Sequence, residues 1–153
     1  MFEIQDITEI KADINLEILT KIAKEAALIG NDILIKNYNK IQTINSKGRK
    51  GDLVTNVDLE VEEKIKEYLS KKTPDISIHA EESGKLIKSS DLTWCIDPLD
   101  GTTNYSHGYP FFGTSIGLIY ENTPILGSIS VPYLNELYYA CIGKGSFCNN
   151  KKI

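Results

Sequence analysis

The spacing of the apolar residues places helices in the first half of the chain and strands in the second. From Ile14 to Tyr38, apolar side chains recur at helical spacing with charged residues between them and no proline, which predicts one long amphipathic helix. A second apolar repeat, at every fourth residue from Val57 to Leu69, predicts a second helix that ends near Lys72. Two long helices followed by strands are typical of an α+β fold, with the helices packed on a mostly antiparallel sheet.

Strand-like segments follow the second helix, and residues that favour turns separate them. The expected strands are Ile76 to Ile78, Leu92 to Ile96, Gly113 to Tyr120, Pro124 to Val131 and Leu137 to Ile142. The last three are separated only by short turn signals, so we expect them to form an antiparallel meander.

Three other segments carry weaker signals. Ile41 to Ile44 predicts a short strand, and the polar, glycine-containing segment Asn45 to Asp52 predicts a mobile surface loop. Near the end of the chain, Asn149-Asn150 is a good two-residue turn. The three residues from Lys151 to Ile153 are too few to predict a return strand.

Length and charge limit the classes of function. A chain of 153 residues suffices for one domain, so we expect a single domain over residues 1–153. Its 17 Lys and Arg against 21 Asp and Glu give a net charge of −4 and no basis for a nucleic-acid partner. No apolar run reaches the ~20 residues of a membrane helix, and Met1 to Asp13 lacks the apolar core of a signal peptide. We therefore expect a cytoplasmic protein without a membrane partner.

The segment Trp94 to Asn104 carries the sharpest chemical signal. An apolar strand leads to Asp97 and Asp100, which are followed by a glycine and two threonines. With the carbonyl of Leu99 and the hydroxyl of Thr102, these carboxylates form an all-oxygen ligand set of the kind that Mg²⁺ prefers. A helix beginning directly after the acids would also direct free N–H groups toward a phosphate. The alternative is that Asp97 caps a helix and Asp100 is solvated.

Two further acidic segments are candidates for the same site. Glu81 and Glu82 follow an expected strand, where adjacent carboxylates repel each other and usually lie in solvent. A divalent cation would remove that repulsion. Asp58 opens the expected second helix, where it could serve only as an N-cap or could, with Thr55, orient a water molecule.

Three segments resemble the motifs of the inositol monophosphatase family of metal-dependent phosphomonoesterases. Asp97 to Tyr105, with the sequence DPLDGTTNY, matches the family's most specific motif nearly letter for letter. Ala80 to Ser83 matches its glutamate motif, and Asp52 to Asp58 matches the segment that opens its second helix. The resemblance covers nearly all of the chain but only the N-terminal half of a usual member. It implies the N-terminal, metal-binding domain of that fold, with the second α/β layer and the C-terminal domain absent.

The resemblance also implies the metal ligands. Glu81, Asp97, the Leu99 carbonyl and Thr102 would hold a first Mg²⁺, and Asp97 and Asp100 would hold a second, so that Asp97 bridges the two ions. A third, outer ion is possible, and Mn²⁺ is a possible substitute for Mg²⁺.

The remaining site residues follow from the same resemblance. Glu82 would support the outer ion, and Asp58 and Thr102 would orient the attacking water near Thr55. The substrate phosphate would be bound by backbone and side-chain donors of Gly101, Thr102 and Thr103 and approached by Lys47.

Because only half of the family pattern is present, three hypotheses remain. The chain is a Mg²⁺-dependent enzyme, a non-catalytic metal-binding or regulatory module, or one part of a split or truncated enzyme. As an enzyme it would hydrolyse inositol monophosphate or a related sugar phosphate, with weak activity alone. The Thr103-Asn104 pair resembles the inositol phosphatase branch more than the fructose bisphosphate or nucleotide bisphosphate branches. We expect a second polypeptide or a homo-oligomer to cover the exposed face of the sheet.

Overall fold

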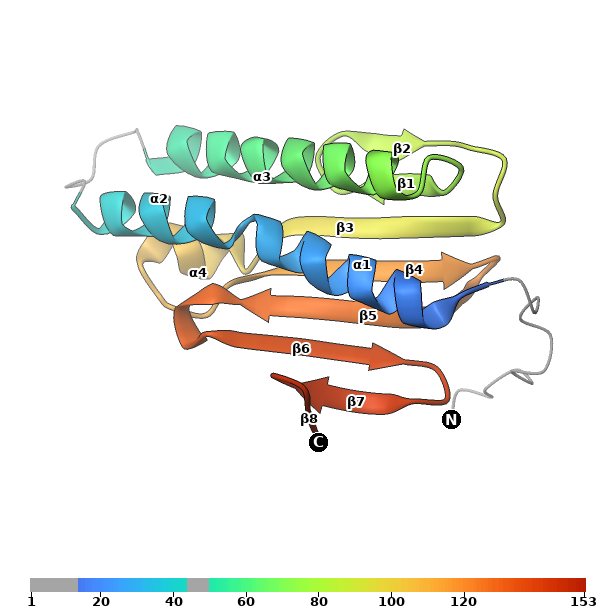
Figure 1. The fold of residues 1–153 in the computed structure, drawn as a ribbon. Coiled ribbons are helices and arrows are strands. Elements are labelled where there is room, and N and C mark those ends of the chain that lie inside the picture. Colours follow the sequence, from blue (N-terminus) through green and yellow to red (C-terminus); the bar gives the residue numbers. More distant parts are fainter. Residues whose placement is uncertain (1–13, 44–49) are drawn as a thin grey trace.

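Three helices cover one face of an eight-stranded sheet (Figure 1). This computed structural model describes residues 14–43 and 50–153. The helices are α1 (Leu16–Ile29), α2 (Asn31–Thr43), α3 (Lys50–Lys72) and the short α4 (Thr102–His107). The strands are β1 (Ser77–Ala80), β2 (Gly84–Leu86), β3 (Leu92–Asp100), β4 (Gly113–Tyr120), β5 (Thr123–Val131), β6 (Glu136–Cys141), β7 (Gly145–Cys148) and β8 (Lys151–Lys152). Their order in the sheet is β2-β1-β3-β4-β5-β6-β7-β8, and the arrangement confirms the α+β fold.

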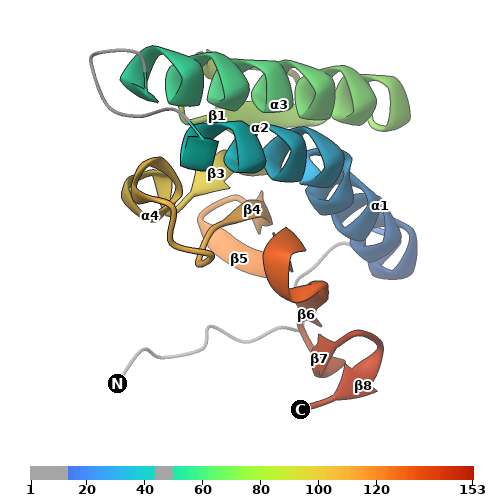
Figure 2. The ribbon, with the colours of Figure 1, turned by 90° about the vertical axis from the view of Figure 1, so that its left-hand side faces the viewer.

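The single helix expected from Ile14 to Tyr38 is in fact two helices that meet at Gly30. The apolar spacing continues across Gly30, but this residue is buried where the chain passes between α3 and β4. A Cβ atom on Gly30 would lie 2.7 Å from Cγ1 of Val61 and 3.1 Å from Oγ1 of Thr114. The chain changes direction at this close contact (Figure 2). Helix α2 then continues to Thr43, so the strand expected at Ile41 to Ile44 is wrong for the residues described.

Helix α3 begins earlier than the sequence predicted. It starts at Lys50, so the end of the expected loop, Lys50 to Asp52, is helical, while residues 44–49 lie outside the described part. Asp58 is therefore an interior residue of α3, and its predicted place at the start of the helix is wrong. Its carboxylate is too far along the helix to cap the first-turn N–H groups.

Most of the sheet is antiparallel, as expected, and β4 has the bounds that were predicted. The exception is β1, which pairs with β3 in parallel. The last residues do form a return strand, since Lys151 and Lys152 pair with Cys148 and Phe147. Asn149 and Asn150 have φ values of 47° and 67°, the conformation of a tight hairpin turn that lets even two residues pair back.

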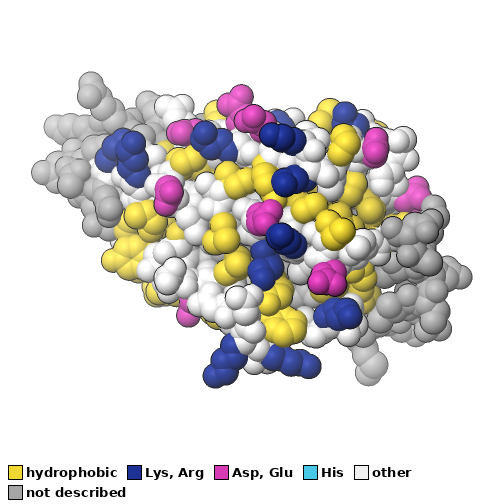
Figure 3. Space-filling view, viewed as in Figure 1, with side chains coloured by type: hydrophobic (Ala, Val, Ile, Leu, Met, Phe, Trp, Pro, Cys, Tyr) yellow, Lys and Arg dark blue, Asp and Glu magenta, His cyan; other side chains and the backbone are white. Residues whose placement is uncertain are grey.

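The core lies between the helices and the sheet. Alternate residues of β3 and β4, such as Trp94, Ile96, Ile116 and Leu118, are buried against α1 and α3. The outer surface of the helices carries interspersed acidic and basic side chains (Figure 3). This pattern fits amphipathic helices with one buried and one solvated face. None of the helices in the described ranges has the length and apolar composition required to cross a membrane.

The opposite face of the sheet carries none of the helices α1, α2 and α3 (Figures 1 and 2). The strand register aligns a row of small residues across the middle of this open face. The row consists of Cys95, Gly117, Gly127, Ala140 and Ser146. Along this row, therefore, the side chains rise only a short way above the backbone of the sheet.

Candidate metal centre

The parallel pairing of β1 with β3 brings Glu81 and Asp97 to the same edge of the sheet. Ala80 pairs with Ile96, and the N–H of Glu81 donates to the Ile96 carbonyl at 3.1 Å, which continues the pairing by one residue. Parallel strands end at the same edge of a sheet, so the residues that follow them are neighbours. Glu81 and Asp97 both line a hollow of about 500 Å³, with Ser115 of β4 on its far side.

Asp97 is held in an environment that disfavours its charge. Partial burial, the charges of Glu81 and Asp100 and a hydrogen bond with the Glu81 side chain raise the pKa of Asp97 to about 7. A hydrogen bond with the backbone of Leu99 lowers this pKa, but by less than the other effects raise it. Oδ1 of Asp97 is buried and has no hydrogen-bond partner among the described residues. An acidic oxygen of this kind is a natural ligand for a cation.

Asp58 contributes a second carboxylate from the helical layer. Only 6% of its surface is exposed, and burial followed by the charges of Glu82, Asp97 and Glu81 raises its pKa to about 7. Its Oδ1 atom is also buried without a hydrogen-bond partner in the described part of the chain. The structure thus brings Asp58, Glu81, Glu82 and Asp97 within electrostatic reach of one another, although they come from three separate segments.

A further acid, Glu62, was missed by the sequence analysis. It lies one helical turn after Asp58 on α3, and only 2% of its surface is exposed. Its carboxylate accepts hydrogen bonds from the backbone N–H groups of Glu82 at 2.8 Å and Ser83 at 3.1 Å. The four-residue spacing from Asp58, on a face that continues to buried Ile65, was the signal that could have found it.

The segment after Asp97 turns sharply into α4. The pairing of β3 with β4 is irregular between Asp97 and Asp100, and Gly101 has φ 84°. A Cβ on Gly101 would lie 2.7 Å from the carbonyl oxygen of Phe111, so this position requires glycine for space as well as for conformation. The Thr102 hydroxyl donates to the Leu99 carbonyl at 2.9 Å, which brings these two predicted ligand oxygens together. The helix expected to begin after the two acids is confirmed.

Buried tyrosines fix α4 against the helical layer. The Tyr105 hydroxyl donates to the Leu34 carbonyl at 2.7 Å, and the Tyr38 hydroxyl donates to the Gly108 carbonyl at 2.6 Å. The rings of Tyr38, Tyr105 and Phe112 also pack against one another, with centroids 4.7–5.7 Å apart. Helix α4 is therefore anchored through Tyr105 in its middle and through Gly108 at its C-terminal end. Thr103, the next predicted phosphate ligand, is exposed at the start of this helix.

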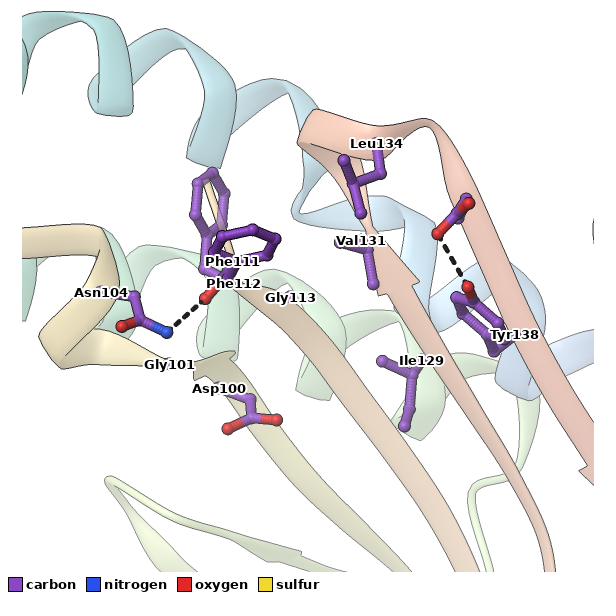
Figure 4. Close-up of a pocket in the computed structure, with 11 residues that line it drawn as sticks. Asp100, Gly101, Asn104, Phe111, Phe112, Gly113, Ile129, Val131, Leu134 and Tyr138 are labelled. Carbon is purple, nitrogen blue, oxygen red and sulfur yellow. Dashed lines mark hydrogen bonds between the residues drawn. The ribbon is translucent and has the colours of Figure 1, made fainter. Parts of the chain in front are cut away.

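Asp100 lies at the edge of a second hollow, of about 350 Å³ (Figure 4). The other walls come from α4, from the segment between α4 and β4, from β5 and from β6 with the turn between them, and they are largely apolar. They include Phe111, Ile129, Val131 and Leu134. The polar side chains of the hollow besides Asp100 are those of Asn104, Glu136 and Tyr138, and the Tyr138 hydroxyl donates to Oε2 of Glu136 at 2.8 Å. A small organic molecule that contacted Asp100 would have this hollow beside it.

Two predicted site residues cannot be placed in the site. Lys47 lies outside the described residues, and Thr55 lies in α3 but its side chain is not described. Within residues 14–43 and 50–153, no three His, Cys, Asp or Glu side chains are already close enough to hold one ion. The predicted ligands of the first ion combine two carboxylates with a carbonyl and a hydroxyl oxygen, and those of the second are two carboxylates. Their roles remain predictions.

Known proteins resemble this chain in sequence. A sequence model of the inositol monophosphatase family matches residues 15–153. The chain is 42% identical over 141 residues to a protein of Aquifex aeolicus named fructose-1,6-bisphosphatase/inositol-1-monophosphatase, covering 91% of this chain and 53% of that protein. It is 40% identical over 140 residues to inositol-1-monophosphatase of Synechocystis, covering 91% and 49% of the two chains.

Solved structures agree with the sequence comparison. Inositol monophosphatase from Anabaena superposes with a TM-score of 0.76 and 39% identity, covering 92% of this chain and 50% of that one. The suhB protein of Bartonella henselae gives a TM-score of 0.77 at 32% identity, covering 88% and 52%. The chain spans about half the length of the relatives that it matches. Over that span, sequence and fold place it in the inositol monophosphatase family.

Proposed function

We propose that the described carboxylates bind Mg²⁺ and that this chain supplies the metal-binding half of a phosphomonoesterase. The observation that carries the proposal is the pair of buried, unpartnered oxygens, Oδ1 of Asp58 and Oδ1 of Asp97, among further acids. Buried carboxylates that repel one another destabilise a fold unless a cation or a proton neutralises them. The proposed ligand atoms are all oxygens, which fits Mg²⁺ or Mn²⁺.

The proposed ligands divide between two ions. Glu81, Asp97, the Leu99 carbonyl and Thr102 would hold the first, and Asp97 and Asp100 would hold the second. Glu82 would support an outer ion. When bound, Mg²⁺ supplies positive charge at the substrate phosphate and at the oxygen that leaves.

The residues of the chain orient the other reactants. Oδ1 of Asp58 would accept a hydrogen bond from the attacking water, with Thr55 three residues earlier on the same helix and Thr102 opposite. The backbone N–H groups that begin α4, together with the Thr103 hydroxyl, would donate to the phosphate oxygens. Lys47 would add a positive charge to this phosphate site. In the reaction, the water oxygen forms a bond to phosphorus, the bond to the substrate alcohol breaks, and the alcohol leaves with a proton.

The proposed substrate is inositol monophosphate or a related sugar phosphate. The hollow beside Asp100 has room for a small carbon skeleton, and Asp100 and Glu136 are acceptors for its hydroxyl groups. The relatives from Aquifex and Synechocystis are named for inositol-1-phosphate hydrolysis, and the former also for fructose bisphosphate hydrolysis. Both substrates therefore belong in the test.

We also propose that a further polypeptide covers the open face of the sheet. The side chains in the row across the sheet are small enough for another helix or strand to approach the sheet closely. Beside this row, Ile129 is an apolar residue that is 41% exposed. The relatives are about twice as long as the span matched here, so their remaining length is a polypeptide of suitable size. This polypeptide would either continue the same chain or be a separate one.

The test is Mg²⁺-dependent release of phosphate from inositol 1-phosphate and fructose 1,6-bisphosphate. Residues 1–153 should be at least about 100-fold slower alone than with the remaining half of a relative added, because an open site loses electrostatic preorganisation. Asp97→Asn should abolish the restored rate. Full activity from a monomer of residues 1–153 would contradict the proposed partner, and no activity in either sample would contradict the proposed reaction.

A further inference from the structure

Glu62 fastens the turn that carries Glu81 and Glu82. The turn connects β1 to β2 and consists of Glu81, Glu82 and Ser83. Two consecutive backbone N–H groups of this turn, those of Glu82 and Ser83, donate to the two oxygens of the Glu62 carboxylate at 2.8 and 3.1 Å. Hydrogen bonds that involve a charged group are shorter and stronger than neutral ones.

Lys66 strengthens the same connection. Its Nζ lies 3.8 Å from Oε1 of Glu62, one helical turn earlier, and donates to the Ser83 hydroxyl at 2.6 Å. The turn is thus bonded to α3 through two backbone N–H groups and one side chain. All three contacts converge on Glu62 and Lys66, while the side chains of Glu81 and Glu82 remain exposed and free of this connection.

The bonds from the turn to Glu62 and Lys66 act against the electrostatic repulsion between Glu81 and Asp97. Glu81 and Asp97 follow paired parallel strands and line the same hollow, so two carboxylates of like charge lie close together. The bond from the Glu81 N–H to the Ile96 carbonyl holds the first residue of the turn. Without a further anchor, the turn would still relieve this repulsion by moving the Glu81 side chain farther from Asp97. Glu62 prevents that movement at the cost of a buried carboxylate, which the two N–H groups and Lys66 offset.

We propose that Glu62 is a positioning residue, which holds Glu81 beside Asp97 so that both can bind one divalent cation. The inference rests on the proposed function, because it assigns Glu81 and Asp97 to a common ion. Glu62 itself touches neither the ion nor the substrate. Its role is to reduce the rearrangement that the site undergoes when the ion binds, in the way that residues behind metal ligands commonly act.

The experiment measures cation affinity and the dynamics of the turn in the same variants. Mg²⁺ and Mn²⁺ binding to residues 1–153 is followed by isothermal titration calorimetry. Hydrogen exchange of the Glu82 and Ser83 amides is followed by NMR without metal. Glu62→Gln removes the charge and one acceptor, and Glu62→Asp keeps the charge but shortens the reach by one methylene. The matched control is Glu63→Gln, which makes the same change at the next, exposed residue of α3.

We expect Glu62→Gln to lower cation affinity about 10- to 100-fold and to accelerate exchange of both amides. Glu62→Asp should lose at least about fivefold in affinity, since geometry and not charge alone is required. Glu63→Gln should change affinity less than about twofold, because an exposed charge is screened. If Glu62→Gln fails to fold, Lys66→Met serves in its place and should accelerate exchange of the Ser83 amide and lower affinity about two- to fivefold.

Three results would overturn the inference. In the first, Glu62→Gln exchanges its amides faster but binds the cation as the wild type does. In the second, Glu62→Asp binds with wild-type affinity while Glu62→Gln loses affinity. In the third, Lys66→Met, where it is used, changes neither the exchange nor the affinity. The second result would mean that Glu62 acts only through its charge. Failure of the proposed function has a different signature, because the wild-type chain would then bind neither Mg²⁺ nor Mn²⁺.

Discussion

Gly30 lies so close to Val61 that a Cβ atom on the glycine would be 2.7 Å from Cγ1 of the valine. This contact sets the distance between the α1–α2 junction and α3, the helix that carries Asp58 and Glu62. The φ of Gly30 is −75°, a value that any residue can adopt, so the requirement for glycine here is one of space.

Gly30→Ala should therefore lower the free energy of unfolding by about 1–3 kcal/mol, because the added methyl group overpacks the contact. Urea denaturation measures the change. Gly117→Ala is the matched control, since a Cβ there meets only Cys95 at an ordinary 3.9 Å, and it should change stability much less. Val61→Ala combined with Gly30→Ala should be less destabilising than the sum of the two single changes. Additive effects would show that the Val61 contact is not the cause.

Thr73→Val should destabilise the fold through the buried Trp94. The Trp94 indole N–H donates to the Thr73 hydroxyl at 2.9 Å, and Trp94 is fully buried. Valine has nearly the shape of threonine but no acceptor, so the indole N–H would lose its partner at a cost of about 1–3 kcal/mol. Thr73→Ser keeps the hydroxyl and should retain most of the stability. Equal loss in the two variants, measured by thermal unfolding, would assign the effect to the methyl group instead.

Asp97→Asn should weaken Mg²⁺ or Mn²⁺ binding about 100-fold, roughly 3 kcal/mol, because Asp97 is the carboxylate proposed to contact both ions. Isothermal titration calorimetry on residues 1–153 gives the affinity directly. Asp75→Asn, an equal change at an exposed acid outside the site, is the control and should bind as the wild type does. Wild-type affinity in Asp97→Asn would remove Asp97 from the ligand set.

Asp58→Asn should stabilise the metal-free protein at neutral and higher pH. The pKa of Asp58 is raised from 3.8 to about 7 in the folded state, first by burial and then by neighbouring acids. Between these values the folded state holds a proton that the unfolded state has lost, so the free energy of unfolding falls as pH rises from about 4 to about 7. Asparagine has no carboxyl group to ionise, so the variant does not lose this stability as pH rises.

In EDTA, the stability of Asp58→Asn should therefore match the wild type near pH 4 and exceed it by about 1–3 kcal/mol at pH 8. Denaturant unfolding at the two pH values measures this difference. Asp75→Asn, on the surface, should show no such dependence on pH. A gain of the same size at pH 4 would mean that the cost of holding a charged, buried carboxylate at this position is not the reason.

Local sequence pattern was sufficient where each residue's partner is close in the chain or where the burial alternates regularly. Strand β4 has its predicted bounds because residues from Gly113 to Tyr120 alternate between a packed and an open face. The helix after Asp100 was likewise predicted from a short motif, because a glycine with a left-handed conformation leads directly into it. The ligand oxygens of Leu99 and Thr102 meet for the same local reason.

The break at Gly30, the parallel pairing of β1 with β3 and the burial of Glu62 were decided only by the tertiary structure. Apolar spacing runs on through Gly30, and Val61 and Thr114 from distant segments leave no room for a side chain at this position. Glu62 is one acid in a charged stretch of sequence, and it becomes a buried anchor because β1 delivers the N–H groups of Glu82 and Ser83 to it. Hydrogen bonds and steric contacts between remote segments form only after the layers have packed. A local pattern such as the four-residue spacing from Asp58 to Glu62 can indicate a buried face, but it does not identify the partner.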